Sequence, residues 1–218
     1  ADVDSEYDYE LLGYITPKKM GQAYHCPVFN GLSKQTTSEQ LMDLGTQLNI
    51  HGIVPMFHVV GVTPEAADVH TAFLGRKDPP VVTITNEDLA QARAEISAGT
   101  GKADFCILGC PHLTINQVGS IAKMLDGQQL AGQLYIFTST STKELAQRMG
   151  YLDIIHKAGG EIVINSCVDQ PCWSHLYGMS GVTESPKCAY YTKRWNMTFT
   201  VKSIPACIQS VLKGEIVS

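Results

Sequence analysis

The stretch DFCILGCPH, residues 104–112, combines an apolar run with a cysteine that directly follows it. A second stretch, EIVINSC at residues 161–167, repeats this arrangement. Both apolar runs have the length and composition of buried β-strands. In an open α/β sheet, ligands bind at the carboxyl ends of the strands. Cys110 and Cys167 are therefore expected at one sheet edge, where two thiols suit metal or cluster ligands better than core packing.

Outward from these runs, strand-like and helix-like segments alternate from about residue 49 to the end of the chain. This alternation predicts an α/β fold built from parallel-sheet units. The expected strands are residues 53–59, 81–85, 105–108, 134–138, 162–165 and 197–201. The expected helices are residues 63–73, 86–97, 115–126, 143–149, 152–157, 187–191 and 205–212.

Residues 1–50 show less regular patterning. We expect them to form an irregular segment that packs on an amino-terminal half absent from this chain. Residues 51–218 are expected to form the α/β region, with a subdomain boundary near residues 98–103.

Charge and hydropathy exclude several classes of protein. The net charge of −5 argues against nucleic-acid binding, which favours a basic surface, and the chain has no apolar run long enough to cross a membrane. The acidic start, ADVDSEYDYE, is unlike an export or transit signal and has no initiator Met, so we expect a piece of a longer protein. Seven cysteines without an export signal favour a reducing compartment, and hence a cytoplasmic protein, over a disulfide framework.

The loop GCPH, residues 109–112, places His112 beside Cys110, and both residue types bind metals. Cys167 and Cys172 are spaced C-x₄-C, which is not a standard zinc pair, and no second pair completes a structural zinc site. Cys106 lies inside a predicted strand and Cys207 inside a predicted amphipathic helix. Both are expected in the core, because free cysteine is often a small buried hydrophobe.

Further polar residues follow other predicted strands. His58 lies near the end of the first strand, and Thr63 is expected to cap a helix whose amino terminus could bind an anion. Ser139 follows a strand within a cluster of hydroxyl side chains. Each has an ordinary structural reading, as a buried histidine or a helix cap.

The stretch TESPK, residues 183–187, supplies Thr183, Ser185 and Lys187 at the start of a predicted helix. Two hydroxyls and an ammonium suit a carboxylate or a phosphate, although a capped surface helix with a solvated lysine would look the same. The sequence contains no GxGxxG, P-loop or GxSxG motif, which removes the usual support for dinucleotide, nucleotide and α/β-hydrolase readings.

At these residues the chain resembles the aconitase X family. The resemblance covers nearly all of the chain and corresponds to the carboxyl-terminal half of the family's large subunit. The motifs that carry it are LGY (12–14), PVFNGL (27–32), MFHVVGVTPEA (56–66), LGCPHLT (108–114), NSC (165–167), TESPKCAYY (183–191) and a cysteine-containing last helix followed by glycine. The chain departs from the family in Thr114, where serine is usual, and in Pro186.

The resemblance implies a hydro-lyase with an iron–sulfur cluster or an iron ion held by three cysteines. Cys110 and Cys167 would be two of them, and the third would lie outside this chain, in the amino-terminal half. His58, Thr63, His112, Ser139, Thr183, Ser185 and Lys187 are the expected substrate-binding residues. A small swivelling domain or subunit would complete the active site and could supply the catalytic base, which this sequence does not identify.

The resemblance leaves the substrate open among cis-3-hydroxy-L-proline, phosphomevalonate and other small hydroxy acids. The composition, rich in Gln, Asn and Cys and poor in charge, favours cis-3-hydroxy-L-proline, the substrate of the bacterial members. The alternative from another class is a non-catalytic assembly module with buried cysteines. Iron and sulfide analysis of the complete protein would separate the two.

Overall fold

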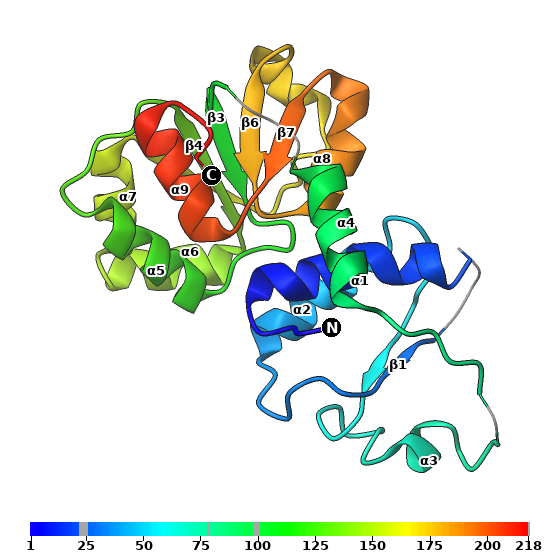
Figure 1. Ribbon diagram of the computed structural model, residues 1–218. Helices are drawn as coiled ribbons and strands as arrows, with labels where there is room; N and C mark the ends of the chain where they lie inside the picture. Colours follow the sequence, from blue (N-terminus) through cyan, green and yellow to red (C-terminus); the bar gives the residue numbers. More distant parts are fainter. Residues whose placement is uncertain (22–25, 78, 98–100, 218) are drawn as a thin grey trace. The chain divides into compact units, whose positions relative to one another are not determined.

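The computed structural model describes residues 1–21, 26–77, 79–97 and 101–217 (Figure 1). The chain forms two compact units, Ala1–Arg93 and Ala94–Ser218. The boundary predicted near residues 98–103 lies slightly farther along the chain, and residues 98–100 of that stretch are outside the described residues.

The first unit is built on two packed helices, α1 (Glu6–Lys19) and α2 (Ser38–Gln47), whose amino termini are closed by capping boxes. Gly13 lets them approach closely, because a Cβ there would lie 2.5 Å from the carbonyl oxygen of Leu44. The prediction that residues 1–50 are irregular is therefore wrong. Residues 9–17 of α1 are all buried, so the helix lacks the one-sided apolar pattern that reveals most surface helices.

The remaining elements of the first unit are short. Strands β1 (Val28–Phe29) and β2 (His58–Val59) pair in parallel, followed by α3 (Val69–Ala72) and α4 (Asn86–Ile96), the last of which continues into the second unit. Most of the strand predicted at 53–59 is not formed, because β2 covers residues 58–59. The first part of the helix predicted at 63–73 is not formed either, because α3 begins at residue 69. The strand predicted at 81–85 is also wrong. Val81 and Val82 are exposed, so this β-branched run has no buried face.

The second unit contains a five-stranded parallel sheet in the order β5-β4-β3-β6-β7. Its strands are β3 (Phe105–Leu108), β4 (Gln133–Thr138), β5 (Gly160–Ile164), β6 (Ser180–Thr183) and β7 (Thr198–Val201). Its helices are α5 (Ile115–Leu125), α6 (Thr140–Arg148), α7 (Tyr151–Ala158), α8 (Pro186–Thr192) and α9 (Ile204–Lys213), with 3-10 turns η1 (Pro171–Leu176) and η2 (Lys193–Trp195). The predicted parallel α/β architecture is confirmed, and every helix and strand predicted in this unit is present within a few residues. Strand β6 was missed, because SGVT is short and contains a glycine.

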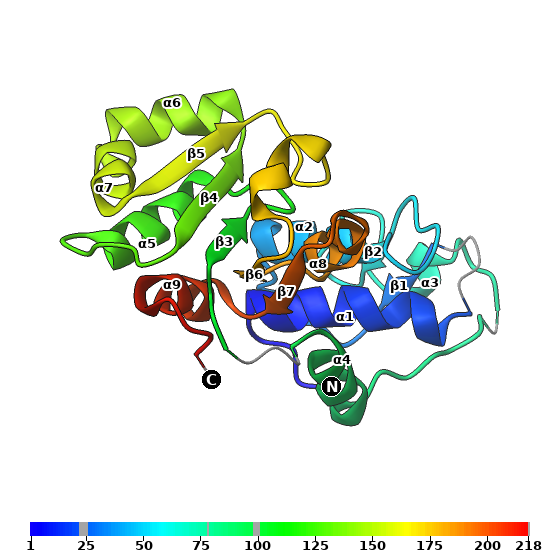
Figure 2. The same cartoon turned by 90° about the horizontal axis from the view of Figure 1, so that it is seen from above.

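Successive residues of the strands point to opposite faces of the sheet, and each face has its own core. Cys106 and Leu108 face a core shared with helices α5, α6, α7 and α9, whereas Phe105 and Ile107 face η1 and α8 (Figure 2). Cys106 and Cys207 are fully buried in the first of these cores, as predicted.

The chain reverses direction across the sheet between β3 and β6. From β3 it adds β4 and β5 on one side, and then returns to place β6 and β7 on the other. The carboxyl ends of the two strands that flank such a reversal diverge into a crevice, which is the usual ligand site of an open α/β sheet. The loops that follow β3 and β6 are therefore the first place to look for function.

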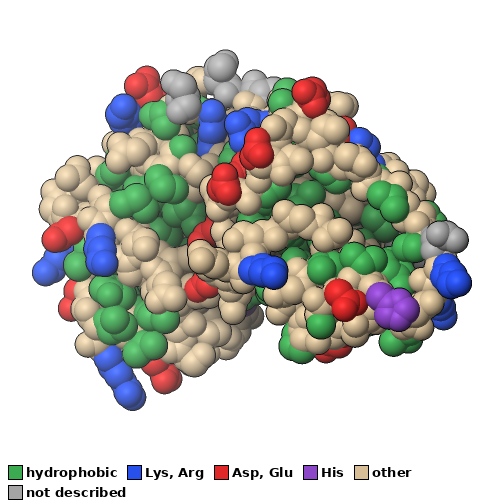
Figure 3. Space-filling view, turned by 60° about the horizontal axis from the view of Figure 1, so that its bottom comes forward, with side chains coloured by type: hydrophobic (Ala, Val, Ile, Leu, Met, Phe, Trp, Pro, Cys, Tyr) green, Lys and Arg blue, Asp and Glu red, His purple; other side chains and the backbone are tan. Residues whose placement is uncertain are grey.

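Among the described residues, no helix combines the length and hydrophobicity needed to span a membrane. On the face drawn in Figure 3, basic and acidic side chains are interspersed.

Candidate functional site

The loop after β3 has a backbone that only glycine can adopt at its first position. Gly109 has φ 114°, and a Cβ on it would lie 2.2 Å from the carbonyl oxygen of Phe137 on β4. The Cys110–Pro111 peptide bond that follows is cis. This tight turn brings Cys110 directly beyond the carboxyl end of the strand.

A buried carboxylate, Glu184, holds this loop from the other side of the reversal. Its Oε1 accepts the backbone N–H of Gly109 at 2.6 Å and that of Cys110 at 3.2 Å. Burial raises the pKa of Glu184, while these N–H donors lower it. Sequence reasoning missed this residue. The sequence did contain a signal, because an acidic residue lies between Thr183 and Ser185 at the end of an apolar stretch. A buried carboxyl group needs a hydrogen-bonding partner.

The Cys110 thiol lies within a polar cluster at the crevice. Burial raises the pKa of Cys110 to about 11, a hydrogen bond with Ser185 lowers it, and the charges of Glu184 and Lys187 act in opposite directions. Cys167 also interacts electrostatically with Cys110. Cys110 thus lies near enough to Ser185, Lys187 and Cys167 for a hydrogen bond from the first and the charges of the other two to act on it.

A hydrogen bond joins the two cysteine loops. His112 Nε2 lies 2.8 Å from the carbonyl oxygen of Ser166, the residue before Cys167. Since a carbonyl oxygen can only accept, Nε2 carries the proton and Nδ1 of the neutral ring is an acceptor. This contact spans the intervening strand β4, because Cys167 follows β5 at the edge of the sheet.

The Cys167 loop is held by contacts at the surface. Cys167 itself is exposed, and its Sγ accepts the backbone N–H of Asp169 at 3.4 Å. The Asp169 carboxylate accepts hydrogen bonds from Arg194 and Trp195 of η2. Asn165, in a left-handed conformation with φ 48°, donates to Thr140 Oγ1 at 2.7 Å and ties the loop to the start of α6.

Thr183 and Ser185 were expected to bind substrate, but their side chains are fully buried. Thr183 Oγ1 donates to Glu184 Oε2 at 3.3 Å, and Ser185 Oγ caps α8 by accepting the N–H of Cys188 at 3.2 Å. The structure therefore places both hydroxyls as supports of Glu184 and Cys110. Lys187, on the first turn of α8, is partly exposed.

The other predicted substrate-binding residues are Ser139 in the second unit and His58 and Thr63 in the first. Ser139 caps α6 by accepting the N–H of Thr142 at 3.2 Å. The prediction that Thr63 begins a helix is wrong, because its hydroxyl instead accepts the N–H of Val59 at 3.0 Å and closes a turn.

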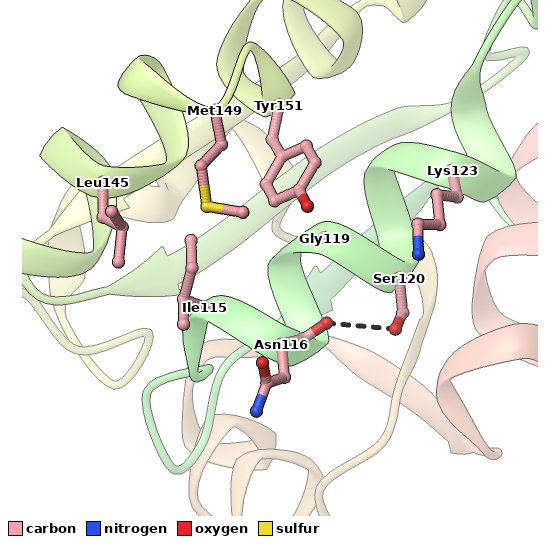
Figure 4. Close-up of a pocket in the computed structure, with 8 residues that line it drawn as sticks. All are labelled: Ile115, Asn116, Gly119, Ser120, Lys123, Leu145, Met149 and Tyr151. Atoms are coloured by element: carbon pink, nitrogen blue, oxygen red, sulfur yellow. Dashed lines mark hydrogen bonds between the residues drawn. The ribbon is translucent and has the colours of Figure 1, made fainter.

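A hollow of about 450 Å³ lies between α5, α6 and the start of α7 (Figure 4). Its lining includes Lys123, Met149 and Tyr151 but none of the predicted site residues. The candidate site therefore remains at the sheet edge. In the part of the chain that the structure describes, no group of three or more His, Cys, Asp and Glu side chains is arranged to hold a metal ion. At this sheet edge, the thiols of Cys110 and Cys167 are the candidate ligands for an iron group.

Comparisons with protein families agree with this architecture. Residues 1–94 match the family model described as the aconitase X second domain, and residues 103–213 match the aconitase X third domain. Among solved structures, the holo-form of aconitase X from Thermococcus kodakaraensis superimposes with a TM-score of 0.82 at 28% identity, over 97% of this chain and 53% of that one.

Two curated relatives are enzymes with different substrates in their names. The phosphomevalonate dehydratase large subunit of Methanothermobacter thermautotrophicus is 34% identical over 194 residues, which are 87% of this chain and 47% of the relative. The cis-3-hydroxy-L-proline dehydratase of Pseudomonas aeruginosa is 32% identical over 171 residues, which are 75% of this chain and 29% of the relative. The chain spans about half the length of the large subunits that it matches.

Proposed function

Because the chain belongs to the aconitase X family, we propose that it is the carboxyl-terminal part of the large subunit of an iron- or iron–sulfur-dependent hydro-lyase. The observation that supports the proposal is that Lys187 and Cys167 both act electrostatically on Cys110, which follows β3 at the reversal between β3 and β6. The third cysteine and the small domain or subunit would come from outside these residues.

Dehydration removes a proton next to a carboxylate and expels a neighbouring hydroxyl group. Cys110 and Cys167 would hold the iron group, which when bound supplies a Lewis acid for the leaving hydroxyl. The thiols fit this role, because both lie beyond strand ends and Cys110 is partly buried. Coordination favours the thiolate, which would counteract the effect of burial on Cys110.

The chain's own residues would bind and orient the substrate. Lys187 would pair with the substrate carboxylate, a role supported by the action of its charge on the Cys110 sulfur. Nδ1 of His112 could accept a hydrogen bond from a substrate hydroxyl, because Nε2 is committed to Ser166. Glu184 keeps the Cys110 loop fixed through the backbone N–H groups of Gly109 and Cys110. Roles for His58, Thr63 and Ser139 in substrate binding stay predictions.

For the substrate we propose cis-3-hydroxy-L-proline. Among the predicted site residues, Lys187 is the one with a permanent positive charge, which matches a single carboxylate better than a carboxylate together with a phosphate. Phosphomevalonate is the second candidate, and the relatives from M. thermautotrophicus and T. kodakarensis that carry this name, at 34% and 30% identity, favour it.

The test uses the complete enzyme, purified without oxygen, and assays both substrates side by side. Lys187→Met keeps the aliphatic stem and removes the charge. The loss of one charge-assisted hydrogen bond lowers kcat/KM by about ten- to a hundredfold. Lys123→Met, on the exposed side of α5, is the matched control and should behave as the parent. Turnover of neither substrate would contradict the proposed activity, and an unchanged kcat/KM in Lys187→Met would return this lysine to a surface role.

A further inference from the structure

Asp169 occupies a position from which it can control the geometry of Cys167. It lies two residues after the cysteine, and its backbone N–H donates to the Cys167 Sγ at 3.4 Å. Hydrogen bonds from backbone N–H groups to cysteine sulfur stabilise the thiolate form and tune iron–sulfur centres. This N–H keeps its orientation toward the sulfur as long as Asp169 is held in place.

The Asp169 side chain accepts three hydrogen bonds from Arg194 and Trp195, and these contacts are called the clamp below. Arg194 donates from Nε to Oδ1 at 3.0 Å and from Nη2 to Oδ2 at 2.5 Å, and Trp195 Nε1 donates to Oδ1 at 2.8 Å. A two-pronged arginine contact fixes both the position and the plane of a carboxylate. Trp195 is itself held by Tyr177, whose ring stacks on it with centroids 6.1 Å apart and an interplanar angle of 12°.

The donors belong to η2, which directly follows α8. Glu184, which holds the Cys110 loop, immediately precedes the cap of α8. One continuous segment therefore fixes both cysteine loops, through Glu184 at its start and through Arg194 and Trp195 at its end.

We propose that Asp169, clamped by Arg194 and Trp195, is a positioning residue that aims a backbone N–H at the Cys167 sulfur and thereby stabilises its bond to iron. This inference rests on the proposed iron site. It adds three residues, Asp169, Arg194 and Trp195, that the sequence patterns did not single out.

The experiment compares variants of the complete enzyme, purified without oxygen. Arg194→Met and Asp169→Asn break the clamp. Trp195→Phe removes one donor and keeps an aromatic ring against Tyr177. Arg194→Lys keeps the positive charge but cannot make the two-pronged contact. Arg148→Met, an exposed arginine in the last turn of α6, is the matched control. The readouts are the rate of iron loss to a chelator, the sulfur-to-iron absorption bands and the thermal unfolding midpoint.

Arg194→Met and Asp169→Asn should lose iron on the order of 10- to 100-fold faster than the parent, with shifted absorption bands. The rates of iron loss from Arg194→Lys and Trp195→Phe should lie between those of Arg194→Met and the parent. These milder substitutions keep the test valid if Asp169→Asn fails to fold. A role in folding alone would lower the unfolding midpoint and leave the absorption bands unmoved, which would overturn the proposal.

Cys167→Ser separates this proposal from the proposed function. If Cys167→Ser loses its iron while the clamp variants keep theirs at the parent rate, the positioning role is wrong and the iron site stands. If Cys167→Ser retains iron with parent spectra, Cys167 is not a ligand, and the iron assignment and the positioning role fail together.

Discussion

The two cysteine loops of the second unit are held in place by different kinds of contact. The Cys110 loop is held inside the protein, by a fully buried carboxylate that accepts two backbone N–H groups. The Cys167 loop is held at the surface, by an aspartate paired with an arginine whose side chain is 58% exposed. Buried polar contacts cost much when broken, whereas exposed ion pairs contribute little to folding. The first loop should therefore be fixed by the fold itself, and the second should depend on local positioning.

Replacing Glu184 should have the largest effect on stability. Glu184→Ala leaves the N–H groups of Gly109 and Cys110 without their acceptor and opens a cavity, which should lower the free energy of unfolding by about 2–5 kcal/mol. Glu184→Gln keeps an acceptor oxygen and should cost about 1–2 kcal/mol. Chemical denaturation measures both, with exposed Glu144→Ala as control. Equal stability of Glu184→Ala and the parent would show that the loop does not depend on this carboxylate.

The Cys110 thiol should react much more slowly than the exposed Cys167 thiol in the metal-free protein. With a pKa of about 11, Cys110 is almost entirely protonated at pH 8, so its alkylation should be slow and should accelerate about tenfold per pH unit. Exposed Cys167 should react first. Mass spectrometry of peptides after timed iodoacetamide treatment resolves the two sites, and buried Cys106 and Cys207 serve as internal controls. Cys110 reacting as fast as Cys167 would contradict the difference between the loops.

Breaking the surface clamp should hardly affect folding. We expect Arg194→Met to lower the free energy of unfolding by no more than about 1 kcal/mol, because exposed ion pairs are screened by water. The same denaturation measurement checks this. A loss comparable to that of Glu184→Ala would mean that both loops are fixed by the fold, and the distinction between them would disappear.

The titration of Glu184 should make the free energy of unfolding depend on pH, an effect smaller than those of the substitutions above. The pKa of Glu184 is raised by burial, so the folded state binds this proton more tightly than the unfolded state, where glutamate titrates at about 4.3. The stabilisation from this proton is complete below that value and is lost as the pH rises through the folded pKa. The parent should therefore lose stability relative to Glu184→Gln as the pH increases above about 4. A difference that stays constant with pH would contradict the raised pKa.

Most helices and strands of the second unit could be predicted from the sequence because their signals are local. Val118, Ile121 and Leu125 mark an amphipathic helix, and Thr114 and Gly127 mark its ends. The cysteines at the strand ends were found for the same reason, since an apolar run followed by a thiol is visible without a structure.

The first unit and the clamp depend on contacts between distant residues. Helix α1 is buried on nearly all sides, so its sequence has no polar face to mark it. Glu184 and Asp169 gain their roles from partners 75 and 25 residues away in the chain. Such pairs depend on strand order, and strand order was not available from periodicity.

The iron content of cysteine variants tests the central claim most directly. The complete enzyme, purified without oxygen, is analysed for iron and sulfide as the parent and as Cys110→Ser, Cys167→Ser, Cys106→Ser and Cys207→Ser. We predict that the first two lose the iron, and that the last two retain it with a loss of stability of about 1–3 kcal/mol from the buried hydroxyl. Iron retained at the parent level in Cys110→Ser and Cys167→Ser would contradict the assignment of this sheet edge as the metal site.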